Sequence, residues 1–163
     1  MPPSLRRFLV FQAFLLWQGG FVFYSGVVVP IGTEILGSPL DQGLVTQQVT
    51  NWLNRIGVIW HALFMWELFA EVDPSRLRKR WRIGLWAVSA VLMIALFVLH
   101  PYLDSQFVEN AIPKANWRAF RTAHIAYLWV STGQWVLGLA LAWLTIGAWS
   151  ACPQGFRGTI PVS

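Results

Sequence analysis

Three histidines are the side chains of this sequence with the most obvious chemical potential: His61, His100 and His124. A neutral imidazole binds haem iron, copper or zinc, and helix bundles build such sites from facing side chains. Met65 follows His61 by four residues, one helical turn away, and its thioether is a ligand that Cu(I) and haem iron accept. Binding of a metal or of haem is therefore one hypothesis for this chain.

The candidate site residues fall into two groups. The candidate metal ligands are His61, His100 and His124. The candidate cofactor-binding residues are His61, His100, His124, Met65, Arg121 and Asn54. The identity of a cofactor stays open, with haem b and copper as the two options, and no catalytic residue is predicted.

Two other readings of the same residues stand beside metal binding. In the first, which we favour, His61 donates a hydrogen bond to Thr or Asn on a neighbouring helix, and the other histidines are interfacial. In the second, a proton or ion pathway runs through His61, Asn54, Thr50 and Glu67. Glu67 also has a structural reading, as a residue that reaches the lipid headgroups or pairs with a basic side chain.

The composition is that of a small membrane protein. The chain has 163 residues, of which 12% are charged and 56% hydrophobic, whereas about 25% charged residues is usual in globular proteins. Its mean hydropathy of +0.51 leaves too little polar surface for a soluble fold. With one cysteine, Cys152, no intramolecular disulfide can form. Motifs of soluble enzymes, such as phosphate loops and His-Glu-x-x-His, are absent, which favours a non-catalytic protein.

Hydropathy predicts an all-α fold: a four-helix transmembrane bundle over residues 1–151, followed by a cytoplasmic tail over residues 152–163. The four predicted spans cover residues 8–30, 52–70, 83–100 and 122–149. We expect Pro30 and Gly32 to end the first span and His100-Pro101 to close the third. Ser38 and Pro39 predict an N-cap and first turn for a helix that runs from about Asp41 to Glu71.

The basic residues predict the orientation. With the N-terminus inside, eight of the 12 Lys and Arg residues lie on the inner side and four on the outer side. This bias favours a bacterial inner-membrane protein with cytoplasmic N- and C-termini. Five of the eight lie between Arg76 and Arg82, and their expected role is to fix this topology, with a site for anionic lipid or a partner as the alternative. Glu34 and Asp41 are expected to neutralise Arg55 and Arg121 on the outer side.

Helical periodicity predicts which faces point into the bundle, because unsatisfied polar groups are costly in hydrocarbon. The predicted inward face of the first span consists of Gln12, Leu16, Gly19, Phe23, Gly26 and Pro30. That of the second consists of Thr46, Thr50, Asn54, Gly57, His61 and Met65. The third and fourth contribute Ser89, Met93, Leu96 and His100, and Arg121, His124, Leu128, Ser131, Trp135 and Gly138.

The run Leu16-Trp17-Gln18-Gly19-Gly20-Phe21-Val22-Phe23, followed by Val29-Pro30 and by a helix opening over Gly43 to Asn54, carries a family likeness. With His124 just after a Phe-Arg pair and Ser131-Thr132 beyond it, the chain resembles small four-span bacterial membrane proteins of the copper-resistance-D-like group. The resemblance implies a metal-related or uptake role at the inner membrane.

The sequence therefore predicts a small inner-membrane protein with an accessory or structural role and a polar, histidine-containing pocket toward the outer side. The alternative is a haem b- or copper-binding membrane protein that acts in electron transfer or metal handling. The expected partner is the lipid bilayer, with a homo-oligomer or a membrane complex as the two candidate assemblies. No nucleic-acid partner is expected, because the positive charge is accounted for by topology.

Overall fold

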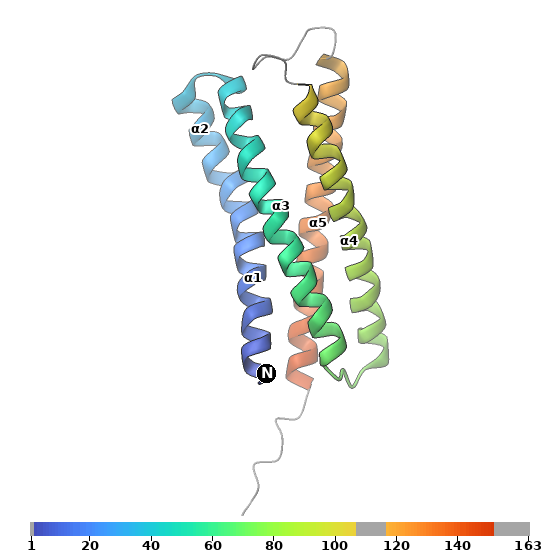
Figure 1. Ribbon diagram of the computed structural model, residues 1–163. Helices are drawn as coiled ribbons and strands as arrows, with labels where there is room; N and C mark the ends of the chain where they lie inside the picture. Colours follow the sequence, from blue (N-terminus) through green and yellow to red (C-terminus); the bar gives the residue numbers. More distant parts are fainter. Residues whose placement is uncertain (1, 107–116, 152–163) are drawn as a thin grey trace, which may run out of the picture.

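A computed structural model describes residues 2–106 and 117–151, and every regular element within these ranges is helical. Four long helical rods lie side by side (Figure 1). The first rod consists of α1 (Pro3–Phe23), a π-helical turn (Tyr24–Val28) and α2 (Val29–Leu36). The others are α3 (Pro39–Ala70), α4 (Arg76–Ser105) and α5 (Trp117–Ala151). The all-α prediction is confirmed. The predicted tail over residues 152–163 lies outside the described residues.

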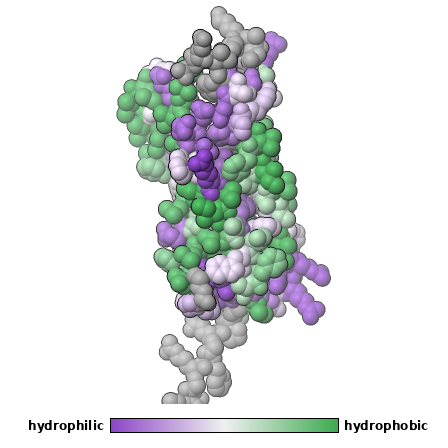
Figure 2. All heavy atoms as spheres, viewed as in Figure 1, coloured by the Kyte–Doolittle hydropathy of each residue, from purple (hydrophilic) through white to green (hydrophobic). Residues whose placement is uncertain are grey.

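Three of the rods are long and apolar enough to cross a membrane: Pro3–Leu36, Arg76–Ser105 and Trp117–Ala151. Helix α3 has 32 residues but is not among them. Figure 2 shows hydrophobic side chains over much of the visible face, with hydrophilic ones gathered in its upper half and others projecting at the lower end, where Figure 1 places the start of α4. These properties are compatible with a helical membrane protein.

Consecutive rods run antiparallel and pack as neighbours, so that α1 lies against α3, α3 against α4 and α4 against α5. Helices α1 and α5 meet at few positions. The main core holds a stack of Trp17 on Trp60, whose ring centroids are 4.9 Å apart, with Phe14 and Phe64 beside it. The aromatic residues of α1 and α3 thus hold one half of the bundle together.

The predicted start of the second helix is confirmed. The Ser38 hydroxyl accepts a hydrogen bond from the backbone N–H of Asp41 at 3.3 Å, and Pro39 occupies the first turn. The helix begins at Pro39 and ends at Ala70. It was expected to run from about Asp41 to Glu71, so both boundaries agree closely.

The prediction that Pro30 ends the first helix is wrong. The chain stays helical to Leu36 and stops at Gly37, which adopts a left-handed conformation with φ 64°. The π turn over Tyr24–Val28 resets the backbone hydrogen bonds, and Pro30 then falls in the first turn of α2. A proline is tolerated there because the missing N–H would have no partner inside the helix.

The prediction that His100-Pro101 closes the third helix is also wrong, because α4 continues through Pro101 to Ser105. The His100 ring and the Asp104 carboxylate are joined at 3.0 Å across this turn. That contact supports the helix at the place where the proline removes one backbone hydrogen bond.

The predicted inward face of the first span is wrong. Phe23 is 61% exposed and Leu16 is 56% exposed, and no atom lies within 4 Å of a Cβ built on Gly19 or Gly26. The buried face is the opposite one and includes Arg6, Val10, Ala13, Phe14, Trp17, Gln18 and Tyr24. Apolar residues predominate on both faces and each face also carries a glutamine, so periodicity did not separate the packed face from the exposed one.

Candidate functional site

His61 is buried in the middle of α3, where both ring nitrogens have protein partners. Its Nδ1 lies 2.7 Å from the backbone oxygen of Gly57. A carbonyl oxygen only accepts hydrogen bonds, so Nδ1 carries the proton and Nε2 presents its lone pair. That lone pair accepts from the Ser89 hydroxyl at 2.9 Å and faces the Gln134 amide nitrogen at 3.4 Å. His61 therefore joins α3 to α4 and α5, whereas the sequence predicted a Thr or Asn partner.

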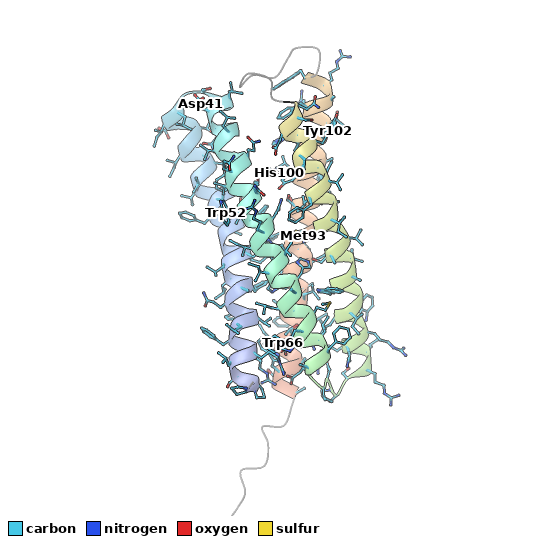
Figure 3. The ribbon with its side chains drawn as sticks, viewed as in Figure 1. Asp41, Trp52, Trp66, Met93, His100 and Tyr102 are labelled. Carbon is cyan, nitrogen blue, oxygen red and sulfur yellow. The ribbon has the colours of Figure 1, made fainter. Side chains whose placement is uncertain are left out.

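His100 lies farther along the bundle, well above Trp66 in Figure 3. Its Nε2 lies 3.1 Å from the Gln47 backbone oxygen and 3.2 Å from the Thr50 hydroxyl, and its ring edge faces Tyr127. Because Nδ1 contacts Asp104, both nitrogens of this ring are also occupied.

His124 is half-buried near the start of α5 and stacks on Phe120, with ring centroids 5.8 Å apart. The three histidines thus occupy three separate environments. Within residues 2–106 and 117–151, no group of three His, Cys, Asp or Glu side chains could hold a metal ion. The structure does not bring His61, His100 and His124 together.

The other candidate residues divide between the interior and the surface. Asn54 is buried and donates from Nδ2 to the Tyr127 hydroxyl at 3.1 Å. Met65 is 41% exposed and Arg121 is exposed, so their predicted inward positions are wrong. Leu128 also faces outward, at 51% exposed. The role of Asn54, Met65 and Arg121 in cofactor binding stays a prediction.

A small, partly open cavity of about 30 Å³ lies between α1, α3 and α5, with Leu96 of α4 also in its wall. Its polar lining consists of Gln18, Thr50, Asn54, Tyr127, Ser131 and Gln134. Aromatic rings form much of the remaining wall, including Trp17 and Trp135. We call this space the interior cavity. Of these residues, Thr50, Asn54 and Ser131 were predicted to lie on inward faces. Gln18 and Gln134 were not predicted to do so.

A cluster of charges that sequence analysis did not assemble lies at the end of the bundle where α1 begins. Arg6 donates to Glu67 at 2.5 Å and also to Glu71, while Arg7 donates to Glu71 at 2.8 Å. Glu67 is fully buried and accepts a further bond from the Trp149 indole at 2.6 Å. We call these four charged residues the ion-pair cluster. The reading of Glu67 as the partner of a basic residue is confirmed, and the reading that it reaches headgroups is wrong.

The antiparallel topology contained a signal for this cluster, because Arg6, Arg7, Glu67 and Glu71 were all expected at the same end of the bundle. The predicted neutralisation of Arg55 and Arg121 by Glu34 and Asp41 has no such support. Arg55 lies over the Trp52 ring at 5.0 Å, and none of the ion pairs found in the described ranges joins these four residues.

The basic run from Arg76 to Arg82 has more than one role. Arg78 binds the Asp73 carboxylate at 2.7 Å, and Arg82 approaches it at 3.5 Å. Arg76 and Arg80 are exposed and are free to act in topology. Two members of the run therefore stabilise the turn between α3 and α4.

The Asp73 carboxylate predicts a pH dependence. The hydrogen bond from the Arg78 guanidinium lowers the pKa of Asp73 below its ordinary value. A lowered pKa stabilises the fold above the unfolded value of about 3.9 and loses that contribution as pH falls through the folded pKa. We expect Asp73→Asn to cost about 1–3 kcal/mol at neutral pH.

Thermal unfolding in detergent from pH 7 to pH 3 would test this, with exposed Glu34→Gln as the control. The gap between wild type and Asp73→Asn should begin to narrow as pH falls below about 3.9 and should continue to shrink toward pH 3. A gap that stays constant down to pH 3 would contradict the role of the ionised carboxylate.

Gly138 lets α1 approach α5 beside the interior cavity. A Cβ at this position would collide with the Gln18 amide nitrogen and lie 3.1 Å from the Gln18 Cδ atom. We expect Gly138→Ala to cost about 1 kcal/mol, the low end for overpacking, because the far end of the Gln18 side chain has to move away. Gly19→Ala, which meets open space, is the matched control and should leave the melting temperature unchanged or raised. Equal melting temperatures for the two variants would refute this close approach.

Comparison of the chain with known protein families, with curated proteins and with solved structures finds no match.

Proposed function

We propose that the chain is a four-span inner-membrane protein with a non-catalytic, accessory or structural role. The observation that carries this proposal is that the buried polar groups bind one another across helices. His61 binds Ser89, Asn54 binds Tyr127, and Arg6 binds Glu67. A site for substrate chemistry needs such groups free to meet a ligand, whereas here they join helices.

The length and the surface of α3 support its assignment as a membrane span, the second in chain order, which brings the number of spans to four. Its polar residues Asn54, His61 and Glu67 are buried, and large apolar residues such as Ile59 and Phe69 are exposed. These three polar groups lower the average hydropathy of the helix but do not face outward, whereas its exposed polar residues Asp41, Gln48 and Arg55 lie in the part of α3 before residue 56. A helix of this kind can cross a membrane when its polar groups are satisfied inside the bundle.

The proposed orientation places both termini in the cytoplasm. The start of α1, the turn before α4 and the end of α5 lie at one end of the bundle (Figure 1). The exposed basic residues Arg76 and Arg80 lie at this end as well, which agrees with the positive-inside rule.

Reporter fusions test the span number and the orientation together. A reporter after Ser163 should be active only in the cytoplasm, and one inserted between residues 106 and 117 only in the periplasm. An insertion between Gly37 and Ser38 should report the periplasm too. If that insertion and the Ser163 fusion reported the same compartment, the four-span proposal would be wrong.

The haem b or copper alternative, including the resemblance to the copper-resistance-D-like group, finds little support in the described residues. Both ring nitrogens of His61 are occupied, and the cavity of about 30 Å³ is far below the roughly 300 Å³ of ordinary ligand pockets. The residues present therefore do not fit haem. A reduced-minus-oxidised optical spectrum of the purified protein, with iron and copper quantified, tests this. A Soret band or a stoichiometric metal would overturn the structural proposal.

His61→Asn distinguishes a structural histidine from a ligand. We expect this variant to unfold more easily, by about 1–3 kcal/mol, because the Ser89 hydroxyl and the Gly57 carbonyl lose their partner. His124→Asn should have a smaller effect, because that ring is only half-buried. Melting temperatures and metal content would be measured for both variants. Loss of a bound metal or chromophore from His61→Asn alone would favour the ligand reading.

A further inference from the structure

The interior cavity is lined by three side chains with an atom that lacks a hydrogen-bond partner among the described residues. These atoms are the side-chain oxygens Oε1 of Gln18 and Gln134 and the indole nitrogen of Trp135. Gln18 is only 5% exposed and Gln134 only 1% exposed. An unpartnered buried polar atom costs about 1–3 kcal/mol, so three such atoms on the side chains around one cavity favour an occupant that can bond them.

The unpartnered atoms define the chemistry of the occupant. Two of them accept hydrogen bonds and one donates, so the complementary molecule offers two donors and at least one acceptor. None of the residues that line the cavity is charged at neutral pH, which favours a neutral molecule over an ion. The volume of about 30 Å³ has room for roughly two waters at about 10–15 Å³ each.

We propose that the interior cavity is a binding site for water, and that this water bonds Gln18, Gln134 and Trp135 together. Without it, α1 and α5 meet at few positions. With it, a continuous hydrogen-bonded path leads from Gln18 through the water to Gln134, and on to His61 and Ser89. These four residues come from α1, α5, α3 and α4, so the water completes a network that joins all four rods.

A bridging water is a property of the bundle itself and does not depend on the accessory role proposed above. It would hold the four rods together whatever the function of the protein. It also does not depend on the orientation in the membrane. Failure of the topology experiment would leave it standing.

A double-mutant cycle tests the bridge. We expect Gln18→Leu and Gln134→Leu each to lower the melting temperature by about 2–4 °C or more, because each removes a ligand of the water. The double variant should be less destabilised than the sum of the two, since both act on one bridge. Gln12→Leu, at an exposed position on α1, should change little.

Two outcomes of this cycle would overturn the proposal. In a dry cavity Gln18 Oε1 would have no hydrogen-bond partner and would destabilise the fold. Gln18→Leu would then leave the melting temperature unchanged or raise it. Strictly additive losses would likewise show that the two glutamines share no ligand. Gln18→Met, which differs in shape from leucine, should give the same sign as Gln18→Leu.

A measurement on the unaltered protein guards against variants that fail to fold. Solid-state NMR transfer from water should reach the Trp135 indole N–H, assigned with Trp135→Phe, at short mixing times. The Trp60 indole is an internal control, because its nitrogen is also buried and unpartnered but lies in the aromatic core. Equal, slow transfer to both indoles would refute a water in the cavity.

Melting temperatures in two salts distinguish water from a small cation as the occupant of the cavity. Ammonium chloride and sodium chloride at equal ionic strength should have the same effect on the melting temperature if the occupant is water. A rise with ammonium alone would identify a cation in the cavity and overturn the proposal of a neutral occupant.

Discussion

Glu67→Ala is expected to be among the most destabilising single substitutions in this protein, at about 3–5 kcal/mol. The carboxylate of Glu67 is fully buried and binds both the Arg6 guanidinium and the Trp149 indole. Its removal leaves a buried positive charge next to only one remaining carboxylate, that of Glu71. The free energy of unfolding in mixed micelles, followed by circular dichroism, would measure the loss.

A second variant separates the loss of the ion pair from the loss of packing. Arg6→Met combined with Glu67→Leu replaces both charges by apolar groups, and we expect it to recover much of the stability. Glu34→Ala, at an exposed position, is the control for loss of a carboxylate. If the double replacement were no more stable than Glu67→Ala alone, an uncompensated charge could not be the cause.

Trp60→Ala is the second substitution with a large expected effect, at about 3–5 kcal/mol. Trp60 is 1% exposed and stacks on Trp17, with Phe64 and His61 against its other sides. Alanine would leave a large void at the place where α1 and α3 meet. The same unfolding measurement applies.

Trp143→Ala is the matched control, because this tryptophan is 78% exposed. We expect the control to cost less than about 0.5 kcal/mol. Similar losses for Trp60→Ala and Trp143→Ala would contradict the assignment of Trp60 to the core.

The helices could be predicted from the sequence much better than their contacts. Strong local signals marked the start of α3, where Ser38 caps the helix and Pro39 fits the first turn. Pro30 and Pro101 were misleading as predicted helix ends. A π turn precedes Pro30 and the His100–Asp104 contact spans Pro101, so the helix continues past each proline. The buried face of α1 could not be predicted, since apolar residues occur all round the helix and lipid is as apolar as a protein core.

Among the candidate residues, burial was predicted correctly for polar side chains that lie within apolar helices. Asn54, His61 and Ser89 are polar residues within apolar helices, and all three are buried as expected. Met65 was assigned to the same face by its spacing from His61, but an apolar thioether meets no penalty at an outward position. Gln18 and Gln134 were missed because the predicted faces of α1 and α5 were drawn through other residues.

The ion-pair cluster has a consequence for the synthesis of the protein. Arg6 is separated from Glu67 by 61 positions in the chain. At ordinary elongation rates this distance corresponds to about 3–12 s of translation. During that interval the first helix has left the ribosome with an arginine whose partner does not yet exist. The amino-terminal segment therefore cannot complete its ion pairs until the end of α3, which carries Glu67, has also emerged.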